Sequence, residues 1–301
     1  MDDEMLARAL PSLLADLWGI DKARVQPLGG GMNSATALVE TSDAGRYVAK
    51  WSRDVESLDA GCVSAAALVE RGVRAGEPVR TTVGALTASI AGGALALLRH
   101  VPGRELTGET PTDQQLIGTT LAQAHRAGGP ELGTGPFMSE WLSPPDQVPD
   151  VAEWLPSALQ EVRREYAALP ALTWTQLHTD PTPEAFIHDA DADVTGLIDW
   201  AGSCRGPALY DVASAVMYLG GPDQSERFLS SYVASGPLEE PELAWLDPLR
   251  RLRWAIQASY FASRIAADDH TGIEDDPQHN QASLARARRG LDETGSPRPV
   301  R

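Results

Sequence analysis

Two aspartates in the middle of the chain each follow a short apolar run. Asp180 comes after residues 173–177, which are rich in threonine and aromatic side chains, and Asp199 closes the run 194–198. Two short strands that each deliver a carboxylate to a loop would bring a catalytic base and a metal ligand side by side. Phosphoryl transfer needs that pair, because one carboxylate orients the attacking hydroxyl while the other holds Mg²⁺ against the nucleotide phosphates.

The chain has 301 residues and a formal net charge of −17. This length allows a large buried core in one composite unit or two lobes. The negative charge argues against a nucleic-acid partner, which needs a surface of Lys and Arg. An acidic cleft would favour a cationic substrate, although acidity that only keeps the protein soluble is the simpler explanation.

The compartment is indicated by what the sequence lacks. Cys62 and Cys204 are the only cysteines, and they lie far apart without metal-ligand spacing, so neither a disulfide framework nor a zinc site is predicted. The first residues are acidic where a signal peptide would be basic. No apolar run approaches the length needed to span a membrane. We therefore expect a cytoplasmic protein with no membrane partner.

The first hundred residues have the pattern of a mostly antiparallel sheet with two helices. Apolar spacing predicts helices over 4–18 and 57–71, and strands over 25–28, 35–41, 46–51, 78–82, 86–90 and 94–100. Pro102-Gly103 then marks a change of composition and a lobe boundary.

The rest of the chain has helical periodicity. Helices are predicted over 112–127, 151–169, 208–219, 224–235 and 242–267, with a Gly- and Pro-rich loop over 128–149. A short helix near 281–291 followed by a disordered tail is expected at the end. The predicted class is α+β with two lobes: an antiparallel-sheet lobe (1–101), a helical lobe carrying the catalytic loop (102–267), and a polar helix and tail (268–301).

Several motifs occur in one order along the chain. Gly29-Gly30-Gly31-Met32-Asn33-Ser34 lies between two strands, Lys50 lies on the next strand, and His178-Thr179-Asp180 and Ile198-Asp199-Trp200 follow. The segment 205–213 has the sequence RGPALYDVA. In this order the chain resembles the aminoglycoside phosphotransferase and choline-kinase-like family, which has a protein-kinase-like fold. The resemblance covers about residues 25–218, with homologous helices continuing to about residue 267.

The resemblance implies roles for the residues of the two acid-bearing loops. Asp180 matches the catalytic base, with a cap on the Pro181–Pro183 turn as the structural alternative. His178 matches a catalytic-loop histidine that supports the backbone. Asp199 matches the acid that holds Mg²⁺, with a strand-end cap as the alternative. Asp211 matches an acid that ties the catalytic loop to the second lobe.

The resemblance also implies a nucleotide site for ATP or GTP. Lys50 would pair with the α- and β-phosphates, unless it is an exposed strand lysine. Gly30, Gly31, Asn33 and Ser34 would form a turn that covers the phosphates, where glycines allow close backbone approach; a flexible hairpin is the alternative. His100 lies in the segment that joins the lobes and offers backbone groups to adenine.

The chain departs from the family pattern at three positions. The metal-binding asparagine expected five residues after Asp180 is Ala185, so either the adjacent Glu184 serves as a metal ligand or one metal on Asp199 suffices. The helix after Lys50 offers only Glu56 or Asp59 as an early acidic partner. Thr179 replaces the glycine of the motif.

Two functions follow from these residues. The first is a small-molecule kinase that uses Mg²⁺ and transfers the γ-phosphoryl group of ATP or GTP to a substrate hydroxyl. The second is a catalytically weak or inactive pseudokinase that binds a nucleotide or another ligand, as Ala185 and the missing helix glutamate would suggest.

Overall fold

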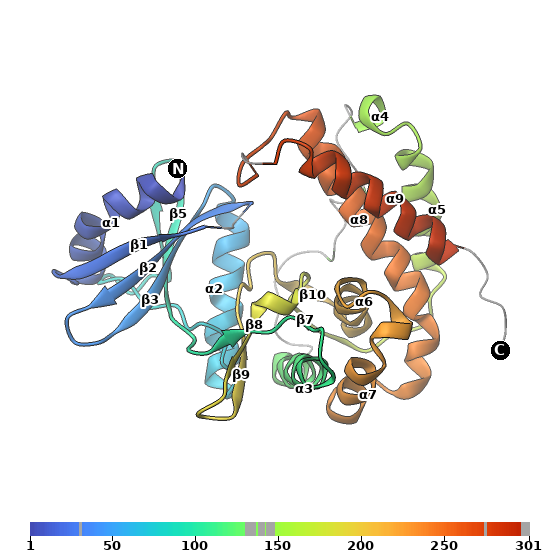
Figure 1. Cartoon of the computed structure of the whole chain (residues 1–301), viewed down its shortest axis with the longest axis horizontal. Coiled ribbons are helices and arrows are strands. Elements are labelled where there is room, and N and C mark those ends of the chain that lie inside the picture. The colour runs from blue at the N-terminus through green and yellow to red at the C-terminus, as the bar shows by residue number, and fades with distance from the viewer. Residues whose placement is uncertain (30–31, 130–136, 138–141, 143–147, 274–275, 296–301) are drawn as a thin grey trace.

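The computed structural model describes residues 1–29, 32–129, 137, 142, 148–273 and 276–295. A lobe built on an antiparallel sheet lies beside a mostly helical lobe (Figure 1). The predicted two-lobed α+β architecture is confirmed.

The first lobe contains a five-stranded sheet in the order β1-β2-β3-β5-β4. Its strands are β1 (Ala23–Leu28), β2 (Ser34–Thr41), β3 (Arg46–Ser52), β4 (Thr87–Ile90) and β5 (Gly93–Arg99). In the central register Lys50 of β3 lies opposite Thr36 of β2 on one side and Ala96 of β5 on the other. This register fixes the position of Lys50 along β3 relative to both neighbouring strands.

Two helices flank the sheet, α1 (Asp3–Trp18) and α2 (Val55–Glu70). Leu6, Leu10 and Leu14 of α1 are fully buried in one cluster with Leu95 and Leu97 of the sheet. The intervening residues of β5, Ala94 and Ala96, pack in a second cluster with Leu58 and Cys62 of α2. Successive side chains of a strand point to opposite faces, so β5 is buried on both sides and α2 is held beside the strand that neighbours Lys50.

The strand predicted over 78–82 is wrong. Only one isolated bridge forms there, between Pro78 and Leu98. Two hydrogen bonds to β5 flank this bridge, from Val79 N–H to Leu97 O at 2.7 Å and from Arg99 N–H to Glu77 O at 2.8 Å. The chain then leaves the sheet, and Thr82 N–H donates to Leu17 O of α1 at 2.8 Å. The edge of β5 is instead covered further along by β4.

The helical lobe carries two small sheets at its junction with the first lobe. One contains β6 (Arg104–Glu105), β8 (Phe186–Asp189) and β9 (Val194–Leu197), and the other pairs β7 (Trp174–Leu177) with β10 (Cys204–Pro207). The helices are α3 (Pro111–Gly128), α4 (Val148–Val151), α5 (Leu155–Ala167), α6 (Ala208–Tyr218), α7 (Glu226–Ser235) and α8 (Leu246–Ala266). Helix α6 is buried from Ala208 to Met217, so it is the central helix of this lobe.

Two predictions for this lobe need correction. The single helix expected over 151–169 is divided into α4 and α5, and Pro156 lies in the first turn of α5, where its missing N–H is not needed. The C-terminal helix is α9 (His279–Gly295), longer than the predicted 281–291. It packs on α8, where a Cβ at Gly290 would collide with the indole of Trp254. The predicted tail after residue 295, and most of the predicted loop over 128–149, lie outside the described residues.

The connection between the lobes runs from β5 into β6. Gly103 has φ 131°, and a Cβ there would collide with the His188 carbonyl, so only glycine fits this crossing. The boundary predicted between the two lobes, after residue 101, falls in this connection. The division of the chain into domains at that residue stays a prediction. In the described part of the chain, no helix combines the length and the apolar character needed to cross a bilayer.

Candidate active site

The segment after β7 is held by a buried carboxylate from α6. Asp211 is fully buried, and its two oxygens accept the backbone N–H of His178 at 2.6 Å and of Thr179 at 2.9 Å. The predicted tie between Asp211 and the catalytic loop is therefore confirmed. Such charge-assisted bonds to backbone amides are stronger than neutral ones, and here they fix the backbone just before Asp180.

A histidine from α3 completes this network. His125 Nε2 lies 3.0 Å from an Asp211 oxygen, and its Nδ1 lies 2.6 Å from the Tyr232 hydroxyl. A carboxylate can only accept, so Nε2 carries a proton, and in the neutral ring Nδ1 is then the acceptor of the phenol proton. Burial, followed by the charge of Asp211, raises the pKa of Tyr232 well above its ordinary value, so the phenol stays a donor. Asp211 is thus satisfied by three N–H donors.

Thr179 lies at the position where the family motif has glycine. Its φ is 76°, in the left-handed region that L-residues disfavour. The bond from its N–H to Asp211 maintains this conformation. The same turn explains the glycine of the motif, and threonine adopts it here at a cost of about 1–2 kcal/mol.

His178 links the two acid-bearing segments. It is 1% exposed, its Nε2 donates to Ile198 O at 2.8 Å, and its ring meets Trp200 edge-on at 4.9 Å between centroids. Within the described residues its buried Nδ1 has no hydrogen-bond partner. The structure therefore places His178 beneath the loop, where it supports the backbone beside Asp199.

Asp180 lies at the surface of the site, with its side chain 56% exposed. Its Oδ1 accepts from the Tyr218 hydroxyl at 2.5 Å and from Arg253 Nη2 at 2.7 Å. The predicted structural alternative was that the Asp180 side chain caps the turn that follows. In the structure Thr182 N–H donates to the backbone carbonyl of Asp180 at 2.8 Å, and not to its carboxylate. The carboxylate is therefore available for chemistry.

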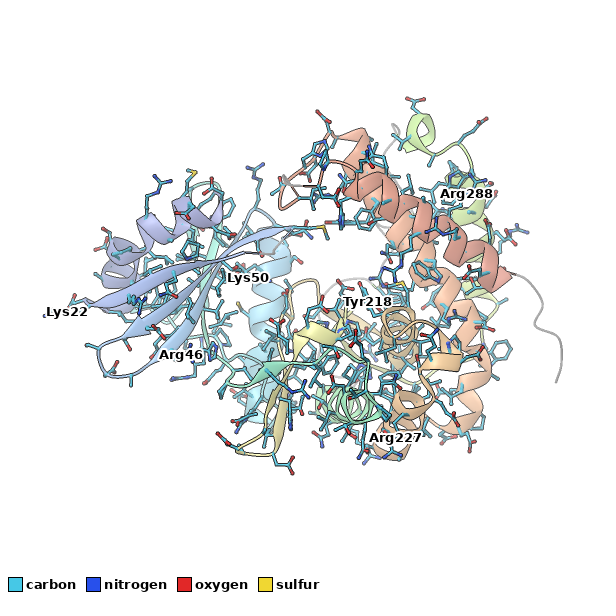
Figure 2. The ribbon with its side chains drawn as sticks, in the orientation of Figure 1. Lys22, Arg46, Lys50, Tyr218, Arg227 and Arg288 are labelled. Atoms are coloured by element: carbon cyan, nitrogen blue, oxygen red, sulfur yellow. The ribbon has the colours of Figure 1, made fainter. Side chains whose placement is uncertain are left out.

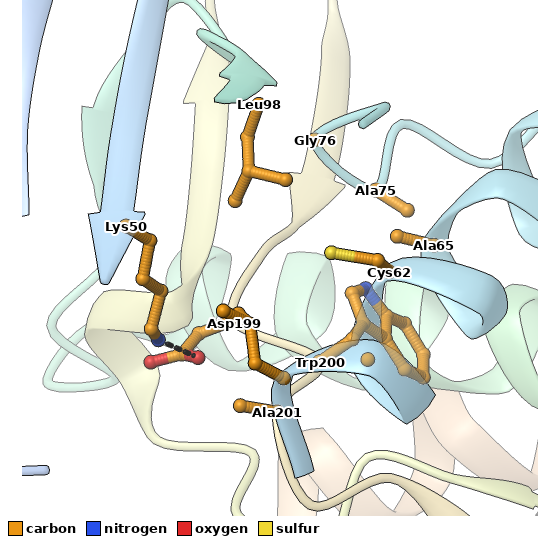
Figure 3. Close-up of a pocket in the computed structure, with 11 residues that line it drawn as sticks. Lys50, Cys62, Ala65, Ala75, Gly76, Leu98, Asp199, Trp200 and Ala201 are labelled. Carbon is orange, nitrogen blue, oxygen red and sulfur yellow. Dashed lines mark hydrogen bonds and ion pairs between the residues drawn. The ribbon is translucent and has the colours of Figure 1, made fainter. Parts of the chain in front are cut away.

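Lys50 and Asp199 form an ion pair between the lobes (Figure 3). The Lys50 side chain is 12% exposed and that of Asp199 is 57% exposed. Partial removal from water alone would raise the pKa of Asp199, but the charge of the Lys50 ammonium and its hydrogen bond outweigh this and hold the pKa below its ordinary value. Asp199 has φ 66°, a strained turn of the kind that occurs at functional sites.

Helix α2 packs directly against the loop that carries Asp199. A Cβ at Gly61 would lie 2.8 Å from the backbone of Trp200 and Ala201, so glycine is needed for this approach. The pocket beside Lys50 is lined on this helix by small or apolar residues, namely Leu58, Gly61, Cys62 and Ala65.

Within the residues that the structure describes, neither Glu56 nor Asp59 of α2 pairs with Lys50. Asp59 accepts from Thr87 Oγ1 at 2.5 Å, and Glu56 lies exposed in the first turn of the helix. Asp199 pairs with Lys50 in their place.

Ala185 lies between the two acid-bearing segments. It is buried, and its carbonyl accepts the N–H of Ile198 at 2.9 Å. Glu184 is exposed in the 3₁₀ turn Pro183–Ala185. Among the described residues, no cluster of three or more His, Cys, Asp and Glu side chains could hold a metal. Mg²⁺ commonly binds through one or two carboxylates together with substrate phosphates and water, and the exposed carboxylate of Asp199 fits that use.

Apart from Lys50, the described residues predicted to bind the nucleotide lie next to the two ends of β3, on the neighbouring segments of the chain. Ser34 pairs with Ser52 at one end of the strand, and the neighbouring Asn33 accepts from the Tyr260 hydroxyl of α8 at 2.9 Å. Gly30 and Gly31 lie outside the described residues.

His100 lies at the other end of β3. Its backbone N–H donates to Arg46 O at 3.0 Å. Burial, followed by the charge of Arg46, lowers the pKa of the His100 ring. Lys50 therefore lies between the two groups predicted to bind phosphates and adenine.

Sequence reasoning missed the residues that the helical lobe adds to this site. Tyr218 ends α6, and Arg253 and Tyr260 lie on α8. Figure 2 labels Lys50 and Tyr218, one in each lobe. The sequence contained a signal, because Arg253 stands between apolar residues from Leu252 to Ile256, all of which are buried in the structure. A buried arginine needs a partner.

This two-lobed fold, with an acid-bearing loop after each of two short strands, is that of the kinase-like class. Residues 24–249 match the phosphotransferase enzyme family. The match covers most of the chain, and the chain belongs to this family.

Curated relatives of the chain include two homoserine kinases. The protein from Xanthobacter autotrophicus is 30% identical over 205 residues, 61% of this chain and 62% of that protein. The protein from a Bradyrhizobium species is 28% identical over 200 residues, with 61% of each chain covered. The chain thus spans about three fifths of the length of these relatives.

Solved structures share the fold at lower identity. An amicoumacin kinase in complex with AMP-PNP and Ca²⁺ has a TM-score of 0.71 at 18% identity, covering 98% of this chain and 97% of its own. The choline kinase of Streptococcus pneumoniae has a TM-score of 0.70 at 18% identity, covering 96% and 98%. The predicted protein-kinase-like fold is confirmed.

Proposed function

We propose that this protein transfers the γ-phosphoryl group of ATP or GTP to a hydroxyl of a small molecule. The observation that carries the proposal is the pairing of Lys50 with Asp199 beside a loop that presents the exposed Asp180. These are the three residues that the family pattern places around the transferred group. The matched kinases support transfer over the alternative of an inactive binding module.

Each residue has a part in this reaction. One Asp180 oxygen accepts a hydrogen bond from the acceptor hydroxyl and directs its oxygen in line with the γ-phosphorus. The new P–O bond forms as the bond to the β-phosphate oxygen breaks, the electron pair leaves on the nucleoside diphosphate, and the hydroxyl proton passes to Asp180 or water. Lys50 donates to phosphate oxygens, and His178 and Asp211 hold the loop.

Asp199 would hold Mg²⁺, which neutralises the charge developing on the phosphates when it is bound. Its pairing with Lys50 keeps the carboxylate ionised, as a metal ligand must be. The Ala185 side chain has no oxygen to bind a metal, and the exposed Glu184 is the nearest acid in sequence that could supply one. We therefore propose a site in which Asp199 is the main protein ligand.

We propose an acceptor that carries a cationic nitrogen centre as well as a hydroxyl. Homoserine and choline, which name two of the matched kinases, share a hydroxyl and a nitrogen centre. The net charge of −17 favours the approach of cations.

The test is nucleoside diphosphate release over a panel of homoserine, amino alcohols, choline and amino sugars, with ATP and with GTP. Asp180→Ala should lower kcat by at least about 100-fold. The exposed Asp191 in the β8–β9 turn offers a control, since Asp191→Ala should change nothing. No turnover above background with any acceptor would refute the proposal.

The metal arrangement has a separate test. Ala185→Asn restores the family ligand and should raise kcat by up to about 100-fold if the missing oxygen limits the rate. Nucleotide should raise the melting temperature only when Mg²⁺ is present, and Asp199→Asn should abolish that dependence. Stabilisation by nucleotide that ignores Mg²⁺ would instead indicate a binding module.

A further inference from the structure

Arg253 is a buried cation on an otherwise apolar stretch of α8. It is 7% exposed, and its neighbours from Leu252 to Ile256 are buried as well. Its Nε donates to Ser214 Oγ at 2.9 Å, which orients the guanidinium plane. Its Nη2 donates to Asp180 Oδ1 at 2.7 Å. A buried charge is tolerated only when it is paired and hydrogen-bonded, and the partner here is the carboxylate predicted to act on the acceptor.

Tyr218 donates to the same carboxylate oxygen from α6. Its hydroxyl lies 2.5 Å from Asp180 Oδ1 and 3.0 Å from Arg253 Nη2. Burial raises the pKa of Tyr218 above its ordinary value against the opposing charge of Arg253, and the charge of Asp180 adds to the rise, so the phenol remains a donor. The guanidinium carbon also lies 5.8 Å from the centre of the phenol ring. The two donors therefore support each other as well as the carboxylate.

The two oxygens of Asp180 have different surroundings. Oδ1 accepts both the phenol and the guanidinium. In the part of the chain that the structure describes, no donor contacts Oδ2. The Asp180 side chain is 56% exposed, although the side chain of Arg253 beneath it is only 9% exposed. One oxygen is thus anchored from below while the other stays open toward solvent.

We propose that Arg253 and Tyr218 position Asp180 for phosphoryl transfer, by anchoring Oδ1 so that Oδ2 meets the acceptor hydroxyl. This inference rests on the proposed function. Orientation of the attacking group is a large part of what a protein supplies in phosphoryl transfer. A carboxylate neutralised by a guanidinium is a weak base, and the loose transition state of this reaction requires orientation more than early proton removal.

The inference predicts a specific kinetic pattern. Arg253→Met should lower kcat by about 100-fold, while KM for the nucleotide stays within about threefold, because the guanidinium acts through Asp180. Tyr218→Phe keeps the ring and should lower kcat by about tenfold. Arg253→Lys should recover only part of the loss, since an ammonium cannot bond Ser214 and Asp180 in one plane.

Arg250 provides the matched control. It lies one turn earlier on α8, is 8% exposed, and pairs with Asp247 at 2.7 Å rather than with Asp180. Arg250→Met therefore removes a similarly buried guanidinium from the same helix and should leave kcat within about threefold of wild type.

A double-mutant cycle separates positioning from a merely structural role. In an Asp180→Asn background, Arg253→Met should lower the residual kcat by less than about twofold, because the two groups act as a unit. A loss as large as in the wild-type background would overturn the inference.

The same four proteins yield a second cycle from urea unfolding. If wild type transfers phosphate to no acceptor, the proposed function fails, and this cycle still decides whether Arg253 holds Asp180. Non-additive changes in the free energy of unfolding are expected, since Arg253→Met and Asp180→Asn each disrupt the same contact between the guanidinium and the carboxylate. Additive changes would show that the contact is not formed in solution.

Discussion

Asp211→Asn is the most informative single change in the region beneath the catalytic loop. It keeps the shape of the side chain and removes one acceptor oxygen. The two Asp211 oxygens accept three N–H donors, from His178, Thr179 and His125. The asparagine amide has one oxygen, so its NH₂ group must turn toward at least one of these donors.

The size of the effect follows from that count. One buried N–H loses its acceptor, which costs about 1–3 kcal/mol, and the remaining bonds lose the assistance of the charge. We expect the free energy of unfolding to fall by about 2–4 kcal/mol in total. Because domains have about 5–15 kcal/mol of stability, the variant should still fold. A displaced loop should also lower kcat by about 10- to 100-fold.

The assay is urea unfolding together with steady-state kinetics. Asp54→Asn is the control, because Asp54 caps α2 by accepting the Ser57 N–H at 3.0 Å in an exposed position. Asparagine caps a helix as well as aspartate does, so that change should stay within about 0.5 kcal/mol. If Asp211→Asn cost less than about 1 kcal/mol and left kcat unchanged, the network would not support the loop as described.

Three further predictions concern individual side chains. Thr179→Gly should leave the free energy of unfolding unchanged or raise it by up to about 1 kcal/mol in urea unfolding, since relief of the left-handed strain at φ 76° exceeds the entropy lost by glycine; a clear loss would contradict this. The hydrogen bond from Arg104 lowers the pKa of Asp113 from 3.8 to about 2, against an opposing effect of burial. Because the pKa of Asp113 is lower in the folded than in the unfolded protein, its ionised carboxylate stabilises the fold above the unfolded pKa, and this stabilisation is lost as the pH falls toward 2. Asp113→Asn should therefore reduce the decrease in the free energy of unfolding at acidic pH. An unchanged decrease would refute the assignment. Burial raises the pKa of Cys62 to about 12, so a thiol reagent at mildly alkaline pH should modify it far more slowly in the native protein than in urea, and equal rates would exclude this environment.

Much of the fold followed from local patterns. The apolar spacing of Leu6, Leu10 and Leu14 predicted α1, and all three are fully buried. The alternating residues of the first sheet predicted its strands, because periods of 2 and 3.6 residues are set by the backbone itself. The strand predicted over 78–82 failed because of tertiary contacts, since Thr82 bonds to α1 and β4 pairs with β5 in its place.

The candidate site was predictable only in part. Motif order pointed to Lys50, Asp180 and Asp199, and the structure brings Lys50 and Asp199 into contact. The partner of Lys50 could not be predicted, because it depends on how closely α2 approaches Trp200 at Gly61. The contacts of Asp180 were hidden for a similar reason, since Arg253 lies 73 residues away in sequence.

The sequence by itself therefore determined the types of side chain available for phosphoryl transfer and the elements that carry them, since both are written in short segments. The tertiary structure decided which charges meet. Lys50 is paired with Asp199 across the lobes, and Asp180 is held by Arg253 and Tyr218. These pairings depend on packing between segments far apart in the chain, and because hydrogen bonds and ion pairs form only at short range, a displacement of a few ångströms decides whether a charge has a partner.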